Sequence, residues 1–272
     1  MSDLPPLRAV IARHALGARR ALGQHFLLDG NLTARIAALA GDLGGRHVVE
    51  VGPGPGGLTR ALLASAAATV TVVEVDPRAV VAMQELAAAT GPRLAVAAGD
   101  ALALDLAALV PAPRQVVANL PYNIASPLLV RWLAQAAAWE RLTLMFQREV
   151  AERIVAAPGT PPYGRLAVLA QWTTSAAIRL RLPPAAFTPP PKVESAVVVL
   201  VPHATQPPPA LFATMERLTA AAFGQRRKML RGALRSLGGE ALLARAGIAP
   251  DRRAETLGVA EFDTLARLLA GG

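Results

Sequence analysis

Short apolar runs alternate with alanine-rich segments between about residues 31 and 156. Each run is short, rich in valine or leucine and bounded by turn residues, so it predicts a buried strand. The predicted strands are 47–51, 70–75, 94–98, 115–118 and 142–146. The segments between them predict helices at 58–67, 77–89, 103–109 and 127–138. This alternation is typical of a parallel sheet with helices on both faces.

The second half of the chain changes pattern. Two further strands are predicted at 177–182 and 196–201, with no good helix between them, so they should form an antiparallel ribbon at the sheet edge. A proline-rich linker follows at 203–210. Beyond it only helical patterns occur, at 211–223, 226–237, 240–246 and 261–269. We therefore expect about seven strands in an α/β domain, residues 1–203, and a small all-helical domain, residues 204–272.

Composition narrows the class of protein. Hydrophobic residues make up 53 % of the 272 residues, which excludes intrinsic disorder, and the absence of cysteine excludes a disulfide scaffold. No apolar run reaches the roughly 20 residues that cross a bilayer, and arginines interrupt the N-terminus where a signal core would lie. We expect a soluble, cytoplasmic protein. Lysine and arginine number 28 against 19 acidic residues, a net charge of +9. Such an excess favours a polyanionic partner, although an arginine-rich solvated surface is the alternative.

Four consecutive predicted strands end in glycine or polar residues. A glycine-rich loop follows the first, Glu74 ends the second, Asp100 follows the third and Asn119 follows the fourth. In an open parallel sheet, ligands bind outside the carboxyl ends of the strands. The sequence therefore predicts a ligand site at this edge.

The glycine loop matches G-x-G-x-x-G at Gly52, Gly54 and Gly57, and Glu74 lies 22 residues after the first glycine. Glycines let a ligand approach the backbone, and the acid suits ribose hydroxyls. NAD and S-adenosylmethionine fit this pattern equally, and a tight turn without a ligand is the alternative. Asp100 can accept from an adenine amine or can cap a helix that starts near residue 101.

Asn119-Leu120-Pro121-Tyr122 places an amide oxygen and a backbone carbonyl close together before an aromatic ring. This set can accept two hydrogen bonds from an –NH2 group while the ring stacks on the base. A dehydrogenase needs nothing of this kind. The alternative is a polar turn in which Asn119 forms an Asx turn and Tyr122 packs.

These residues belong to a longer series of motifs. They run ALGQHFLLD at 21–29, VEVGPG at 49–54, VEVD at 73–76, GDA at 99–101, NLPYNI at 119–124, FTPPPKVES at 187–195 and FGQRRK at 223–228. In this order and spacing the sequence resembles the ribosomal RNA adenine dimethyltransferase family, nearly end to end. The strings NLPYNI and FTPPPKVES are the most specific.

The resemblance implies a class I methyltransferase fold, Rossmann-like with a seven-stranded, mostly parallel sheet, and a small helical C-terminal domain. It implies S-adenosylmethionine as the donor and, as target, two adjacent adenosines near the end of small-subunit ribosomal RNA. The partner is either the RNA itself or an immature small ribosomal subunit. The donor contacts that it implies are His25, Leu27, Gly52, Glu74, Asp100 and Asn119. One departure is His25, where the family usually has asparagine; the ring can also simply pack beside Phe26.

We assign catalytic roles to Asn119, Leu120, Tyr122 and Phe187. The Asn119 side-chain oxygen and the Leu120 carbonyl would accept the hydrogens of adenine N6, so no strong general base is needed. Tyr122 would stack on one face of the flipped base and Phe187 on the other, although Phe187 can also be a core residue. No metal site is predicted.

Two basic stretches without acidic residues are candidates for RNA contact. We assign this role to Arg19, Arg20, Arg226, Arg227, Lys228 and Arg231. On one helix, residues 227, 231 and 235 would share a face; a solvated helix face is the alternative. No feature demands a dimer, so we expect a monomer.

Three other functions compete with this interpretation. One is a large-subunit ribosomal RNA adenine methylase of the antibiotic-resistance type. Another is a non-catalytic RNA-binding assembly factor on the same fold. The last is an NAD-dependent oxidoreductase, which the glycine loop allows but which leaves NLPY unexplained.

Overall fold

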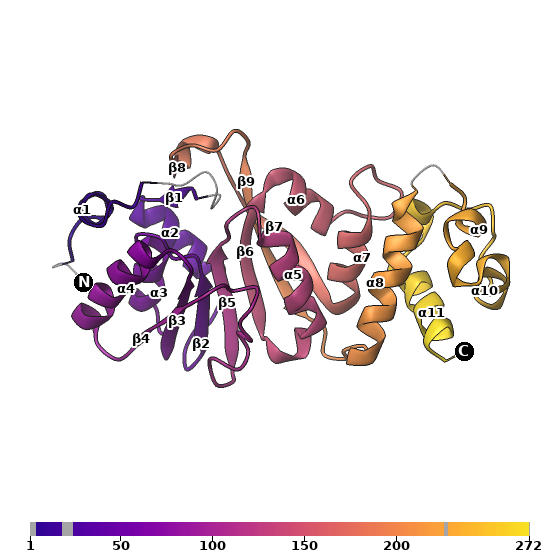
Figure 1. The fold of residues 1–272 in the computed structure, drawn as a ribbon, viewed down its shortest axis with the longest axis horizontal. Coiled ribbons are helices and arrows are strands. Elements are labelled where there is room, and N and C mark those ends of the chain that lie inside the picture. Colours follow the sequence, from indigo (N-terminus) through magenta and orange to yellow (C-terminus); the bar gives the residue numbers. More distant parts are fainter. Residues whose placement is uncertain (1–3, 18–23, 226–227, 272) are drawn as a thin grey trace. The chain divides into compact units, whose positions relative to one another are not determined.

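A seven-stranded sheet forms the centre of the fold in the computed structural model, which describes residues 4–17, 24–225 and 228–271 (Figure 1). The strand order is β4-β3-β2-β5-β6-β9-β7. The five strands from β4 to β6 are parallel, and β9 runs antiparallel to β6. The strands are β2 (His47–Val51), β3 (Thr69–Glu74), β4 (Leu94–Ala98), β5 (Arg114–Asn119), β6 (Arg141–Gln147), β7 (Thr174–Leu182) and β9 (Ser195–Pro202). The prediction of an α/β, mostly parallel sheet is confirmed.

The apolar runs succeed as predictors because the central strands are covered on both faces. β2, β3, β5 and β6 are buried along almost their whole length, which requires near-continuous valine and leucine. The edge strand β4 is only partly buried. The bounds of β2 and β4 agree with the prediction, and the other strands differ by one to three residues at an end.

Three of the predicted helical segments form helices after their strands: α3 (Gly57–Ala64), α4 (Pro77–Thr90), and α5 (Ala125–Ala134) with η2 (Ala136–Ala138). The same part of the chain also holds α1 (Leu7–Arg13), α2 (Gly30–Ala38) and α6 (Arg148–Ile154). The first turn of α4 shows why it starts there, since the Asp76 side chain accepts from the Arg78 N–H and proline occupies the first helical position. The sequence did not predict α1, α2 or α6.

The predicted helix at 103–109 is wrong. That segment forms turns, in which the Asp100 side chain accepts from the Leu102 N–H at 2.8 Å and the Asp105 side chain accepts from the Ala107 N–H at 3.2 Å. These local bonds satisfy backbone groups without a helix. Asp100 therefore caps a turn and not a helix.

A second, two-stranded sheet joins distant parts of the chain. β1 (Phe26–Leu27) pairs antiparallel with β8 (Phe187–Thr188), which follows the short helix η3 (Pro184–Ala186). Strands of two residues leave no periodicity to read, so the sequence could not predict them. This pairing brings the N-terminal motif beside the loop that precedes β9.

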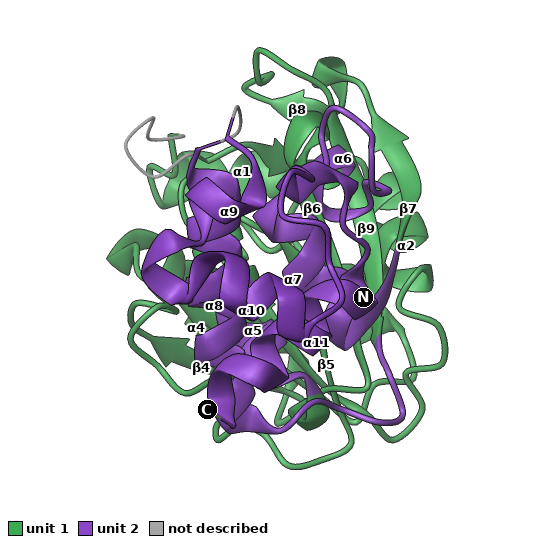
Figure 2. Cartoon of the chain, turned by 90° about the vertical axis from the view of Figure 1, so that its right-hand side faces the viewer, with its two compact units in different colours: residues 1–129, 137–151, 177–201 green, residues 130–136, 152–176, 202–272 purple. Residues whose placement is uncertain are grey.

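The chain divides into two compact units (Figure 2). One comprises residues 1–129, 137–151 and 177–201, and the other comprises 130–136, 152–176 and 202–272. The predicted division into domains at residue 203 stays a prediction. The last segment of the second unit starts at residue 202, close to that position, but this unit also includes residues 130–136 and 152–176. Its elements are α7 (Arg165–Thr173), α8 (Pro209–Gly224), α9 (Leu230–Ala233), η4 (Arg235–Leu237), α10 (Gly239–Arg245), η5 (Ala254–Thr256) and α11 (Val259–Ala270). Buried Met215, Leu218 and Phe262 lie in its core.

The predicted helix at 226–237 is also wrong. Within the described residues this stretch holds only the four-residue α9 and the 3-10 turn η4. The first N–H groups of α9 bond elsewhere, Leu230 to the Arg252 carbonyl and Arg231 to the Pro250 carbonyl, and Gly238 takes a left-handed φ of 104°. Arg231 and Arg235 therefore lie on different elements, and the predicted shared helix face does not form.

None of the helices in the described part of the chain is both long enough and apolar enough to span a membrane.

Candidate active site

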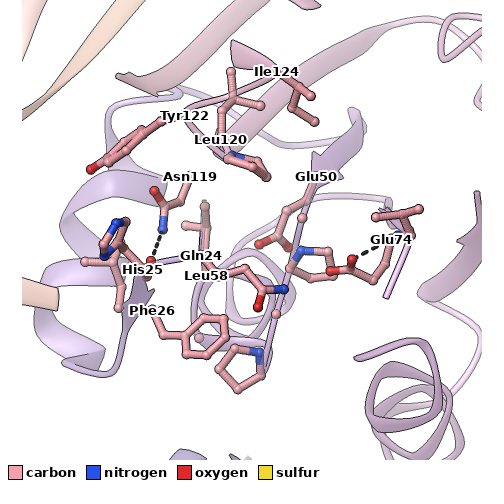
Figure 3. A pocket seen from close by; sticks show the side chains of 18 of the residues that line it. Gln24, His25, Phe26, Glu50, Leu58, Glu74, Asn119, Leu120, Tyr122 and Ile124 are labelled. Carbon is pink, nitrogen blue, oxygen red and sulfur yellow. Dashed lines mark hydrogen bonds between the residues drawn. The ribbon is translucent and has the colours of Figure 1, made fainter. Parts of the chain in front are cut away.

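A cavity of about 260 Å³ lies at the carboxyl ends of the central strands (Figure 3). Its walls come from the ends of β2, β3 and β5, from the turn after β4, and from the N-terminal segment around β1. All six residues that the sequence assigned to the donor line it: His25, Leu27, Gly52, Glu74, Asp100 and Asn119. Leu120 and Tyr122 line it as well.

The loop that lines the cavity requires glycine for two separate reasons. Gly52 and Gly54 adopt positive φ angles of 69° and 54°, which other residues rarely take. Gly57 has no such requirement, but a Cβ there would lie 2.4 Å from the Leu27 carbonyl oxygen. The third glycine of the motif therefore lets the N-terminal motif pack directly on the start of α3.

Glu74 is held in a fixed orientation at the end of β3. Its Oε1 accepts the backbone N–H groups of Val75 at 2.8 Å and Asp76 at 2.9 Å. The side chain is buried, which raises the pKa of the carboxyl, and these backbone hydrogen bonds partly offset that effect. A carboxylate held in this way can accept hydroxyl groups of a bound sugar. Beside it Val75 is 55 % exposed, an apolar surface at the mouth of the site.

The amide of Asn119 has a defined orientation. Its Nδ2 donates to the backbone carbonyl of His25 at 2.9 Å, and a carbonyl can only accept, so this contact fixes which end of the amide is which. Figure 3 shows this bond at the wall of the cavity. The Asn119 Oδ1 is therefore left to accept hydrogen bonds from a ligand.

The His25 ring connects three parts of the site. Its Nδ1 donates to the Pro189 carbonyl at 2.8 Å, and its ring centroid lies 5.4 Å from that of Tyr122 with the planes tilted by 32°. The Tyr122 hydroxyl forms a hydrogen bond with the Ser195 hydroxyl at 2.6 Å. Burial raises the pKa of the Tyr122 phenol. The alternative in which His25 only packs beside Phe26 is therefore too simple.

Phe187 lies behind the site in this structure. Its side chain is 3 % exposed and belongs to the hydrophobic core, where its edge meets the His25 ring at a centroid distance of 6.5 Å. It does not line the cavity. A stacking role for Phe187 stays a prediction, and in the structure the His25 ring lies near both Phe187 and Tyr122.

Sequence reasoning gave no role to Glu50, although it lies in the VEVGPG motif. Its side chain is 2 % exposed, faces the cavity and accepts the Thr59 hydroxyl at 2.7 Å. Burial raises the pKa of the Glu50 carboxyl to about 8. An acidic residue inside an otherwise apolar strand was the signal that could have found it.

The candidate RNA-contacting residues lie in different parts of the chain. Arg19, Arg20, Arg226 and Arg227 lie outside the described residues. Lys228 and Arg231 are exposed, and Lys228 and Arg235 line a shallow surface hollow in the second unit. Their role in RNA contact stays a prediction.

Comparisons with known proteins agree with this geometry. Residues 15–271 match the family model described as ribosomal RNA adenine dimethylase. The chain is 65 % identical over 266 residues to "Ribosomal RNA small subunit methyltransferase A" of Gluconobacter oxydans, covering 98 % of this chain and 88 % of that protein. Its counterpart in Paramagnetospirillum magneticum is 56 % identical, covering 99 % and 96 %.

Two solved structures are also similar. A dimethyladenosine transferase from Plasmodium falciparum aligns with a TM-score of 0.74 at 25 % identity, covering 89 % of this chain and 96 % of that one. The 23S rRNA methyltransferase ErmE aligns with a TM-score of 0.65 at 28 % identity, covering 90 % and 99 %.

Proposed function

The chain belongs to the ribosomal RNA adenine dimethylase family, and from this premise we propose that it dimethylates N6 of two adjacent adenosines near the 3′ end of small-subunit ribosomal RNA. It is an S-adenosylmethionine-dependent methyltransferase of ribosomal RNA. The observation that carries the proposed chemistry is the Asn119 amide, whose Nδ2 is bonded to the His25 carbonyl and whose Oδ1 is available to the substrate.

The cavity is suited to S-adenosylmethionine. Gly52 and Gly54 present no side chains to it, and the Glu74 carboxylate is oriented by two backbone N–H groups for the ribose hydroxyls. Asp100 lies in the turn after β4, where it can accept from the adenine amine. Exposed Val75 offers an apolar surface to the adenine ring.

The substrate nucleophile, N6 of adenine, is weak because its lone pair is delocalised into the ring. When bound, S-adenosylmethionine supplies a methyl group on a positively charged sulfur. Asn119 Oδ1 and the Leu120 carbonyl accept hydrogen bonds from the two N–H groups of N6, which concentrates the lone pair on nitrogen. As the N–C bond forms and the C–S bond breaks, positive charge grows on N6 and the same two oxygens stabilise it.

After transfer, N6 carries a positive charge and is strongly acidic, so its proton passes to water without a dedicated base. Loss of that proton restores a lone pair for the second methylation. Tyr122 stacks on the base after it has left its own stack, and the Ser195 hydroxyl and the His25 ring hold the Tyr122 ring in place. Holding donor and acceptor in line supplies a further part of the rate.

Two alternatives are disfavoured. The 23S rRNA methyltransferase ErmE is 28 % identical to this chain, against 65 % for the small-subunit methyltransferase of Gluconobacter oxydans. A non-catalytic assembly factor would have no need of the oriented Asn119 amide or of the Glu74 carboxylate with its two backbone bonds. We propose that the enzyme acts as a monomer in the cytoplasm on an immature small subunit.

The test is to incubate the protein with methyl-labelled donor and small ribosomal subunits that lack the modification. The RNA is then digested and its nucleosides are separated. Label in N6,N6-dimethyladenosine is the expected result. If the folded protein binds the donor but leaves no label there, large-subunit RNA becomes the next substrate to try; label there would favour the resistance-type function, and no label would favour a binding factor.

RNA contact is tested by the salt dependence of binding. Each phosphate neutralised contributes about −0.9 to the slope of log affinity against log salt for a duplex and about −0.7 for a single strand. Lys228→Ala and Arg231→Ala are each expected to make the measured slope less steep by about one contact. Arg267→Ala is the control, because that guanidinium already pairs with Asp263 at 2.7 Å. Equal slopes in all four proteins would remove these two residues from the interface.

A further inference from the structure

Glu50 is a buried acidic residue that the mechanism above does not use. It lies on β2, two residues before Gly52, and its side chain is 2 % exposed. It nevertheless lines the candidate donor cavity, and Figure 3 shows it between Asn119 and Glu74. A carboxyl group in the middle of a buried strand is costly unless something compensates it.

The described residues that line the cavity around Glu50 include other acids and no arginine or lysine. The Thr59 hydroxyl from α3 donates to Oε2, and the carboxyl of Glu74 at the end of adjacent β3 faces the same space. From the other walls, the titratable groups are His25, Asp100 and Tyr122. Within the described residues no arginine, lysine or histidine forms an ion pair with Glu50.

This setting favours the uncharged acid. Burial and, to a smaller extent, nearby Glu74 raise the pKa of Glu50, the Thr59 hydrogen bond lowers it, and together they bring the pKa to about 8. At neutral pH the side chain therefore keeps its proton in the ligand-free pocket. Near neutral pH, Glu50 therefore becomes charged only when a positive charge enters the cavity.

The donor brings such a charge. S-adenosylmethionine carries a sulfonium and an ammonium group, and a cation inside a cavity screened from water favours ionisation of a neighbouring acid. We propose that Glu50 is the buried counter-charge of the donor, so that S-adenosylmethionine binds with release of the Glu50 proton. This inference rests on the proposed function, because it assumes that the donor occupies this cavity.

The sign of the pH effect follows. Below pH 8 the donor must displace a proton, so its apparent affinity should rise about tenfold for each pH unit as pH approaches 8. Above pH 8 the acid is already ionised and the affinity should level off. A cavity that bound the donor without ionising Glu50 would show neither the rise nor its dependence on this residue.

The experiment is titration calorimetry of the full chain with S-adenosylmethionine at pH 7, in buffers of different ionisation enthalpy. The slope of the observed enthalpy against buffer enthalpy gives the number of protons released. The uncharged fragment 5′-methylthioadenosine is the matched ligand, since it keeps the adenosine and lacks both positive charges. We expect close to one proton from Glu50 with the full donor and none with the fragment.

Glu50→Gln separates the contribution of Glu50 from protons exchanged by Glu74 or by the donor's own amino group. The difference in proton release between wild type and this variant should approach one at pH 7 and vanish above pH 9. Thr59→Val is the second variant; it removes the hydrogen bond to the carboxylate, so the release should persist to higher pH. It keeps the test available if Glu50→Gln does not fold.

The outcomes distinguish the two ideas. Donor binding with equal proton release in wild type and Glu50→Gln would overturn the counter-charge and leave the methyltransferase intact. Equal proton release with the donor and with methylthioadenosine would overturn it too, because closure of the pocket and not charge would then be the cause. Failure of the wild type to bind the donor at all would instead overturn the assignment of the cavity.

Discussion

Asn119→Ala is expected to lower the rate of methyl transfer by about a hundredfold to a thousandfold, the size seen when one group that stabilises transition-state charge is removed. The variant loses the Oδ1 that accepts from adenine N6, so the lone pair stays delocalised and the growing positive charge loses a partner. Single-turnover transfer of labelled methyl to small subunits measures the effect. Donor affinity and thermal unfolding are measured on the same preparation.

The fold should survive this change. Asn119 makes one hydrogen bond to the His25 carbonyl, and its loss costs about 1 kcal/mol of unfolding free energy. Asn119→Asp is the sharper variant, because it keeps an oxygen but cannot donate to His25 when ionised. Asn31→Ala, at an exposed position at the start of α2, is the control and should be fully active. Near-normal transfer by Asn119→Ala with normal folding would falsify the mechanism.

Tyr122→Ala is expected to lower transfer by about tenfold to a hundredfold, because stacking of a base on an aromatic side chain contributes about 1–3 kcal/mol. The loss should fall on the rate and on RNA affinity, with donor affinity nearly unchanged. A substrate in which the target base is already unstacked should be less affected. Transfer to subunits and to a short single-stranded RNA of the same sequence provides this comparison.

Tyr122→Phe is the matched control for the ring. It keeps the aromatic face and loses only the 2.6 Å hydrogen bond to Ser195, so most of the activity should remain. Ser195→Ala removes the same bond from the other side and should behave like Tyr122→Phe. If Tyr122→Phe were as inactive as Tyr122→Ala, the hydroxyl and not the ring would be the functional group.

Local pattern was enough to predict the sheet and the site edge. Strands covered on both faces must be continuously apolar, so β2 could be located within the printed sequence to the residue. The bounds of β4 were also predicted to the residue, although this edge strand is only partly buried. Parallel strands connected by helices place all their carboxyl ends at one edge, so Gly52, Glu74 and Asn119 had to converge. Neither inference needs any knowledge of distant contacts.

Predictions failed where short-range patterns compete with other bonds. The segments 103–109 and 226–237 have helical composition, yet aspartate side chains satisfy the backbone in the first, and the carbonyls of Pro250 and Arg252 accept its N–H groups in the second. The two-residue strands β1 and β8 carry no pattern of their own. They form because residues 160 to 162 positions apart in the sequence pair with each other.

The sequence by itself thus determined the fold class, the edge where ligands bind, and the motifs that identify the family, because each depends on residues close together in the chain. Only the tertiary structure decided the contacts and the burial of those residues. It placed the His25 carbonyl against Asn119, buried Phe187 in the core next to the His25 ring, and buried Glu50 in the cavity that Glu74 also lines. Hydrogen-bond partners, burial and pKa depend on which distant segments pack together, and a linear pattern does not contain that information.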